Sequence, residues 1–127
     1  MYYRDVWYMM KIYLAGGMKS DWQDNVIAAH PQHTYFDPRT HGLDEPAEYT
    51  KWDLEHVEKA DIVFACFTKD NPSGFGMCIE IGAAHRSGKP IILVDEKQLR
   101  SWAIVRCCCN IVVNNLGDGI KILKEWA

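Results

Sequence analysis

The sequence has no concentration of positive charge: its 14 lysines and arginines are outnumbered by 17 aspartates and glutamates, and the net charge is -3. The basic residues are scattered rather than aligned in a stripe, which excludes a surface that follows the phosphates of a nucleic acid. No apolar run approaches the roughly 20 residues of a membrane-spanning helix, and the first residues lack the apolar stretch of a secretory signal. We therefore expect neither a nucleic-acid polymer nor a membrane among the partners.

Paired cysteines are missing as well. None of the five cysteines belongs to a C-x-x-C motif, the arrangement that zinc and redox sites use. Their odd number predicts reduced thiols and a cytoplasmic location. Because neighbours in a strand point to opposite faces, we interpret the run of Cys107, Cys108 and Cys109 as small core residues rather than as metal ligands. The dinucleotide-binding pattern G-x-G-x-x-G is also absent, so neither a metal nor a cofactor is predicted.

Short apolar runs alternate with helical patterns along the chain. We expect strands at 12–15, 34–36, 62–67, 91–94 and 111–113, and helices at about 21–29, 47–59, 77–87, 98–106 and 118–126. Runs that are apolar at every position, such as IVFACF, are typical of a parallel sheet covered on both faces. The pattern predicts an α/β fold: a doubly wound, flavodoxin- or Rossmann-like sheet of about five parallel strands with helices on both faces.

A chain of 127 residues has the size of one domain. We assign that domain to residues 10–127 and interpret residues 1–9, which are aromatic and without clear period, as an N-terminal arm or an upstream start. Ligands of such folds bind beyond the C-terminal ends of the strands. The loop at 37–46 is long enough to be a lid, and Tyr35 and Phe36 before it are candidate pocket walls.

Glu80 is the only charged residue between positions 74 and 84. Its apolar neighbours predict a partly buried carboxylate, and an unpaired buried charge costs several kcal/mol, which indicates function. We expect Gly74 and Gly76 to turn the chain tightly off the preceding strand and to place Glu80 near the first turn of a helix, where the dipole favours an anion. An ionised, poorly solvated carboxylate is a nucleophile. The alternative is a structural glutamate that pairs with a helix end or a lysine.

Asp53 lies within the apolar stripe of the preceding helix, which consists of Tyr49, Trp52, Val57 and Ala60. Residues three and four apart share a helix face, so Asp53 should point toward the core or a pocket rim. Asp61, by contrast, opens the next strand and suits a turn or capping role. Two converging carboxylates suit glycosyl transfer, in which one attacks the anomeric carbon and the other handles protons. Magnesium binding would require further clustered acids.

Two other residues are of interest. Tyr13 lies in the first expected strand, where it is either a core aromatic or part of a site. The five histidines show no ligand spacing, and His41, in the long loop, is the one that we single out for testing.

Four segments between about residues 11 and 106 carry a family resemblance: K-I-Y-L-A-G, W-D-L-E-H-V-E-K-A-D, G-M-C-I-E-I-G-A-A and Q-L-R-S-W. In this order they resemble the nucleoside 2-deoxyribosyltransferases and the related deoxynucleoside 5′-monophosphate N-glycosidases. The resemblance implies that Glu80 is the nucleophile, that Asp53 assists departure of the base and that Tyr13 orients Glu80. It also implies a covalent deoxyribosyl-enzyme, resolved by a second base or by water, and no cofactor.

The two branches of the family differ at the substrate's 5′ end. The N-glycosidases bind a 5′-phosphate through a loop serine, a basic residue and a second serine, which Ser73, Lys19 and Ser101 resemble. Q-L-R-S-W instead resembles a transferase segment that reaches the sugar from a neighbouring subunit, so Gln98 and Ser101 would act across the interface of a homo-oligomer. The glycines at the strand mouth and before the acid, Gly16, Gly74 and Gly76, complete the expected substrate-binding set.

The transferases also carry a base-reading aspartate shortly before the glycines, where this chain has Asn71, Pro72 and Ser73. Three functional hypotheses follow. The first is a transferase that moves the deoxyribosyl group of a 2′-deoxynucleoside to another base. The second is a hydrolase of deoxynucleoside monophosphates, and the third is a nucleotide-binding sensor without turnover.

Overall fold

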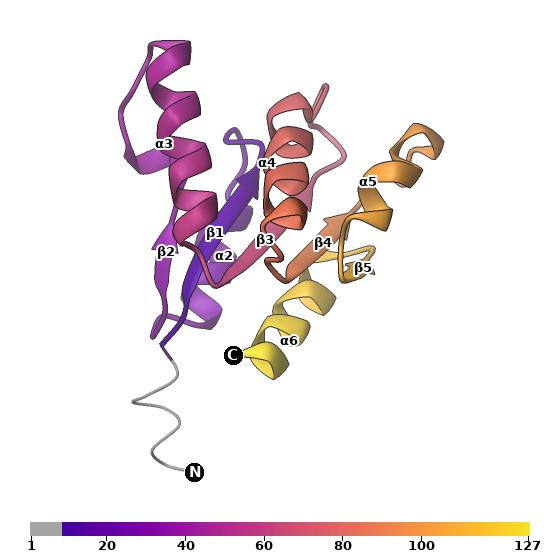
Figure 1. The fold of residues 1–127 in the computed structure, drawn as a ribbon. Helices are drawn as coiled ribbons and strands as arrows, with labels where there is room; N and C mark the ends of the chain where they lie inside the picture. Colours follow the sequence, from indigo (N-terminus) through magenta and orange to yellow (C-terminus); the bar gives the residue numbers. More distant parts are fainter. Residues whose placement is uncertain (1–8) are drawn as a thin grey trace.

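A computed structural model describes residues 9–127, so the expected arm lies, apart from Met9, outside the described part. Five parallel strands form one sheet in the order β2-β1-β3-β4-β5, flanked by helices (Figure 1). The strands are β1 (Lys11–Gly16), β2 (Thr34–Phe36), β3 (Ile62–Phe67), β4 (Ile91–Asp95) and β5 (Ile111–Val113). The helices are α2 (Trp22–Ala29), η1 (Pro38–Thr40), α3 (Pro46–Lys59), α4 (Phe75–Arg86), η2 (Arg100–Trp102), α5 (Ala103–Cys107) and α6 (Leu116–Trp126). The predicted α/β fold is confirmed.

Alternating side chains of the strands explain why both faces of the sheet are covered. Odd-numbered residues such as Tyr13 and Val63 pack with side chains of α3 and α4, while even-numbered residues such as Ile12 and Phe64 pack with α2 and α6. Figure 1 shows α3, α4 and α5 on one face of the sheet and α2 and α6 on the other. The apolar runs of the sequence thus supply two cores at once.

The strand order creates a switch point beside β1. The chain leaves β1 toward β2 on one side, whereas β3 pairs with the other side of β1. Loops that leave neighbouring strands in opposite directions open a crevice at the strands' C-terminal ends. The ends of β1 and β3 therefore define the place for a ligand.

One expected helix is wrong in its first half. The segment 98–106 does not begin as a helix, because Gln98 has the left-handed φ of 54° and its N–H donates to the Asp95 carboxylate at 2.8 Å. A regular turn starts only at Arg100. The Asp95 carboxylate, 1% exposed, also forms an ion pair with Arg106 at 2.9 Å and so holds both ends of this segment.

The cysteine run lies at the end of α5 and in the following turn. Cys108 and Cys109 are half-buried against the core, but Cys107 is exposed. The interpretation as core residues therefore holds for two of the three thiols. Among residues 9–127, no helix is both long and apolar enough to cross a membrane.

Candidate functional site

A cavity of about 460 Å³ lies at the switch point. Its walls come from the loops that follow β1, β2 and β3 and from the helices α3 and α4. Six of the expected site residues line it, namely Gly16, Asp53, Ser73, Gly74, Gly76 and Glu80. Its volume is that of a small-molecule site.

Glu80 lies on the inner face of α4 and is only 8% exposed. The helix begins at Phe75, two residues earlier than expected, so Glu80 falls in its second turn rather than near its first. The hydroxyl of Tyr13 donates to Glu80 Oε2 at 2.7 Å. Tyr13 is fully buried in β1 and does not line the cavity itself, so its hydroxyl contacts the carboxyl group of Glu80 from the side of the sheet.

Burial raises the pKa of Glu80 to about 8. The hydrogen bond from Tyr13 lowers this pKa, and the negative charge of Asp53 raises it. Burial therefore favours the protonated form of Glu80, and the expected ionised carboxylate stays a prediction. The pKa of Tyr13 is raised far above its ordinary value by burial and by the charge of Glu80, so its hydroxyl remains a donor.

Asp53 faces the cavity from α3, and its side chain is 19% exposed. Burial raises the pKa of its carboxyl group, while His41 acts to lower it. Its Oδ1 atom is buried and has no hydrogen-bond partner among the described residues. Such an acceptor is costly unless another group satisfies it. The two acids and Tyr13 thus form one coupled set, in which each carboxyl group affects the pKa of the other.

The loop after β3 is shaped by Asn71. Its Oδ1 accepts hydrogen bonds from the backbone N–H groups of Ser73 at 3.2 Å and Gly74 at 3.1 Å, while Lys97 Nζ donates to its carbonyl oxygen. The composition N-P-S-G is typical of such a turn, so Asn71 was detectable in the sequence. Nothing in the sequence pairs Lys97 with it.

Only one of the two glycines before Glu80 turns the chain. Gly74 has a φ of 70°, and a Cβ atom there would lie 2.7 Å from the ring of Trp102. Gly76 is already helical, and a Cβ atom there would meet nothing within 4 Å. The expected role of Gly76 in the turn is therefore wrong, although this residue does line the cavity.

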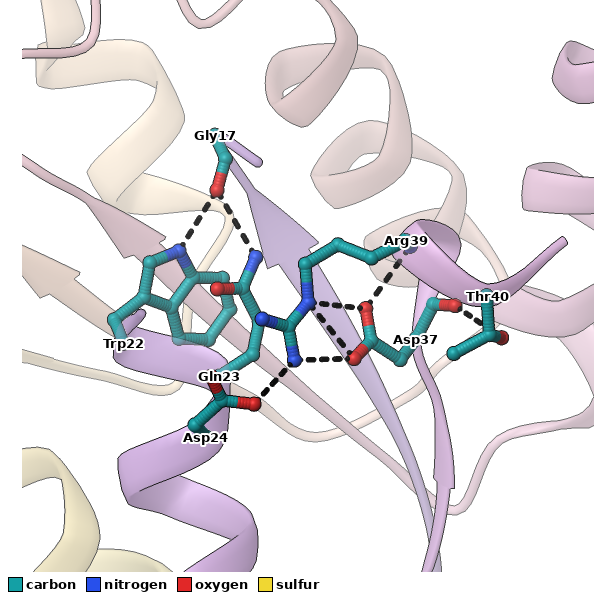
Figure 2. A network of polar contacts seen from close by, with 7 residues as sticks. All are labelled: Gly17, Trp22, Gln23, Asp24, Asp37, Arg39 and Thr40. Atoms are coloured by element: carbon teal, nitrogen blue, oxygen red, sulfur yellow. Dashed lines mark hydrogen bonds and ion pairs between the residues drawn. The ribbon is translucent and has the colours of Figure 1, made fainter. Parts of the chain in front are cut away.

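The loop after β2 is anchored by Arg39. Its guanidinium forms ion pairs with Asp37 at 2.7 Å and with Asp24 of α2 at 2.8 Å (Figure 2). The hydroxyl of Thr40 donates to the carbonyl oxygen of Asp37 at 2.8 Å. These contacts hold the beginning of the loop, whose later residues His41 and Leu43 line the cavity.

The loop after β1 is held by two side chains of α2. Trp22 Nε1 and Gln23 Nε2 both donate to the carbonyl oxygen of Gly17 at 3.0 Å (Figure 2). Gly16 has a φ of 151°, and a Cβ atom there would lie 2.5 Å from the carbonyl oxygen of Cys66. The glycine therefore allows β1 and β3 to lie close together where the cavity begins.

Several expected residues lie outside the cavity. Lys19 lines a smaller neighbouring cavity of about 160 Å³, while Gln98 and Ser101 are exposed and line neither. Tyr35 and Phe36 are not pocket walls: the Tyr35 hydroxyl donates to the carbonyl oxygen of His30 at 2.6 Å, and Phe36 packs against the core. Within residues 9–127, no group of three or more candidate ligands is arranged to hold a metal ion.

Comparisons with known proteins agree with the fold. A family model described as "Nucleoside 2-deoxyribosyltransferase like" matches residues 9–98, the span from β1 to the loop after β4. The solved 2-deoxyribosyltransferase of Bacillus psychrosaccharolyticus is 28% identical, with a TM-score of 0.67 over 85% of this chain and 88% of that one. The CMP N-glycosidase BcmB of Clostridium botulinum is 20% identical, with a TM-score of 0.66 over 91% and 98%, and shares the fold. No curated protein matches the sequence.

Proposed function

The chain belongs to the nucleoside 2-deoxyribosyltransferase-like family, and we propose that it cleaves the N-glycosidic bond of 2′-deoxynucleosides through a covalent intermediate on Glu80. One observation carries this proposal: a buried glutamate, supported by the Tyr13 hydroxyl at 2.7 Å, shares a cavity of about 460 Å³ with a second acid. Enzymes that break glycosidic bonds usually do so with a pair of carboxyl groups.

In the proposed reaction, an oxygen of Glu80 forms a bond to C1′ while the bond from C1′ to the base breaks. The electron pair of that bond leaves with the base, and Asp53 supplies the proton that the base takes up. A second base or a water molecule then attacks C1′, releases Glu80 and returns a proton to Asp53. The residues of the chain thus suffice for both half-reactions without a cofactor.

The raised pKa values of the two carboxyl groups are compatible with these roles. At neutral pH the pair of acids retains a proton, because burial raises the pKa of both carboxyl groups. The reactive arrangement has that proton on Asp53 and the charge on Glu80. The Tyr13 hydroxyl favours this arrangement, since its hydrogen bond is stronger to an ionised Glu80 than to a neutral one.

We expect Tyr13→Phe to move the acidic limb of the pH profile of kcat/KM upward from about 8, the pKa of Glu80. In the wild type the hydrogen bond from Tyr13 stabilises the ionised form of Glu80, so its removal raises the pKa of Glu80. A hydrogen bond to a charged group is worth about 1.5 to 3 kcal/mol, which corresponds to a pKa change of roughly one to two units. Activity should therefore fall at pH 7 and recover in part as the pH rises. Rates between pH 5 and 10 measure the limb.

Tyr35→Phe is the matched control, because it also removes one hydrogen-bonded tyrosine hydroxyl, but a half-buried one that donates to the carbonyl oxygen of His30 away from the cavity. It should leave the limb in place. An unchanged limb in Tyr13→Phe would contradict the support of Glu80 by this hydroxyl.

For the acceptor we propose another nucleobase, so that the enzyme is a transferase. The relative at 28% identity carries that activity. Gln98 and Ser101 are exposed, as residues would be that reach the site of a second copy in a homo-oligomer. Large apolar side chains are also exposed on α4 and around the segment after β4, as at an interface between copies: Phe75, Ile79, Leu99 and Ile104.

A comparison of substrates tests the acceptor and the 5′ group. We expect a free acceptor base to raise turnover and a 5′-phosphate to bring no advantage, when each 2′-deoxynucleoside and its monophosphate are incubated with and without the base. A hydrolase would instead prefer the monophosphate by at least about tenfold in kcat/KM, and Lys19→Ala would remove most of that margin. The control is Lys121→Ala, an exposed lysine on α6. Nucleotide binding without product would support the sensor hypothesis.

A further inference from the structure

The ring of His41 has a fixed orientation. The residue follows η1, and its side chain is 8% exposed. Its Nδ1 atom accepts a hydrogen bond from the backbone N–H of Leu43 at 2.9 Å. A ring nitrogen that accepts a hydrogen bond carries no proton, so the neutral ring holds its proton on Nε2. The backbone of the loop therefore selects the tautomer.

The Nε2 atom of His41 lies 3.7 Å from Asp53 Oδ1, the buried acceptor that lacks a partner among the described residues. The ring packs edge-on against Trp52, the neighbour of Asp53 on α3, with centroids 5.0 Å apart. This separation exceeds a hydrogen bond, but catalytic hydrogen bonds are often long in empty sites and tighten around the substrate. A shift of less than about 1 Å by either side chain would bring His41 Nε2 within hydrogen-bond distance of Asp53 Oδ1.

We propose that His41 is a positioning residue for Asp53: its Nε2–H donates to Asp53 Oδ1 and thereby assists transfer of the proton on the other carboxyl oxygen to the departing base. This inference rests on the proposed function. The proton moves from Asp53 to a nitrogen of the base, which also receives the electron pair of the broken bond to C1′. His41 keeps its own proton throughout.

The contribution of His41 arises in the transition state. As the proton leaves, Asp53 becomes a carboxylate, and a hydrogen bond to a charged acceptor is stronger than one to a neutral acceptor. An interaction that strengthens along the reaction raises kcat rather than substrate affinity.

Other groups around Asp53 do not supply this donor. The Tyr13 hydroxyl donates to Glu80, and Glu80 is ionised in the proposed reactive arrangement, so it has no proton to donate. His56 also affects the pKa of Asp53, but its Nδ1 is 2.7 Å from the carbonyl oxygen of Trp52 and its ring does not line the cavity. Of the histidines in the described part of the chain, His41 is the one that lines the cavity.

Two substitutions separate the hydrogen bond from packing. His41→Phe keeps a ring against Trp52 but removes both nitrogens, whereas the amide of His41→Gln can accept from Leu43 and donate to Asp53. His85→Gln, at an exposed position of α4, is the matched control. We expect His41→Phe to lower kcat by about 10- to 100-fold with KM within about threefold, and His41→Gln to restore most of the loss. Equal losses in both variants would overturn the proposal.

The leaving group gives a second readout. The base of 7-methyl-2′-deoxyguanosine is already cationic and departs as a neutral molecule, so it needs no proton from Asp53. His41→Phe should therefore slow cleavage of 2′-deoxyguanosine far more than cleavage of the methylated compound. For a pyrimidine-preferring enzyme, the corresponding pair is 2′-deoxyuridine and its 5-fluoro derivative, whose base is the better leaving group. The same fold loss on both members of the pair would contradict the proposed role.

A measurement without turnover keeps the two proposals apart. The pKa of Asp53, followed by the carboxyl carbon signal in NMR, should rise in His41→Phe, because a donor to the ionised form is lost. It should stay near the wild-type value in His41→Gln and His85→Gln. An unchanged pKa in His41→Phe would overturn the contact. If the wild type cleaves no deoxynucleoside, the proposed function fails and this titration alone decides whether His41 and Asp53 interact.

Discussion

Glu80→Gln is expected to lower release of the base to below roughly a thousandth of the wild-type rate, the order of loss seen when a catalytic nucleophile is removed. The amide is nearly isosteric with the carboxyl group and can still accept the hydrogen bond from Tyr13, but it cannot form a stable ester with C1′. Product release measured by chromatography gives the rate, and Glu80→Ala provides a second variant. Retention of more than about a tenth of the activity, a change of only ~1.4 kcal/mol in the barrier, would exclude Glu80 as the nucleophile.

The same substitution is expected to stabilise the fold at alkaline pH. The pKa of Glu80 rises from 4.5 to about 8 on folding, so the folded state binds this proton more tightly than the unfolded state does. The resulting stability is complete below pH 4.5 and is lost as the pH rises through 8. Glu80→Gln cannot ionise and should unfold less readily than the wild type at pH 8, by on the order of 3 kcal/mol.

Denaturant titrations of both proteins at pH 5 and pH 8 measure this difference. The gap in the free energy of unfolding should widen with pH. A difference that is the same at both pH values would show that the Glu80 charge costs the fold nothing.

The covalent intermediate can be tested directly. Rapid quench and mass spectrometry should find a deoxyribosyl adduct on the wild-type peptide that holds Glu80, and its absence would indicate direct attack by water.

Asp53→Asn is expected to slow the reaction by roughly 10² to 10⁴ while substrate binding stays within a few-fold, since this is the usual range for a lost proton transfer. The charge of Asp53 raises the pKa of Glu80. Its removal should therefore also move the acidic limb of the pH profile downward, opposite to the shift in Tyr13→Phe. Steady-state rates across the pH range give both quantities.

Asp61→Asn serves as the control for Asp53→Asn. Asp61 Oδ2 accepts a hydrogen bond from the backbone N–H of Lys11 at 2.8 Å, at the start of β1, and the residue does not line the cavity. Its substitution should lower the free energy of unfolding and leave the rate per folded molecule unchanged. The reverse pattern, a slow Asp61→Asn and a fast Asp53→Asn, would exchange the roles of the two acids.

The two acids were accessible to sequence reasoning for local reasons. Glu80 was conspicuous because a single charge in an apolar segment must be either costly or compensated. Asp53 was conspicuous because helical periodicity put it in line with Tyr49 and Val57. Both arguments need only neighbouring residues, and the structure brings both side chains to one cavity.

The misplaced residues are held by polar contacts that apolar periodicity does not encode. Gln98 was expected in a helix, but the buried carboxylate of Asp95 holds its N–H in a left-handed turn. Tyr35 was expected in a pocket wall, but its hydroxyl donates a hydrogen bond to the carbonyl oxygen of His30. In each case a specific polar contact decided the outcome, and periodicity carries no information about such contacts.

By itself, the sequence determined the layered sheet, the order of its elements and the presence of one costly acid on the helix after the third strand. These follow from apolar periodicity, which acts along the chain. Only the tertiary structure decided that Tyr13 donates to Glu80, 67 residues away, and that His41 Nε2 lies 3.7 Å from Asp53. The protonation of the acids was decided there too, because desolvation and the distance between charges exist only once the sheet has brought the strand ends together.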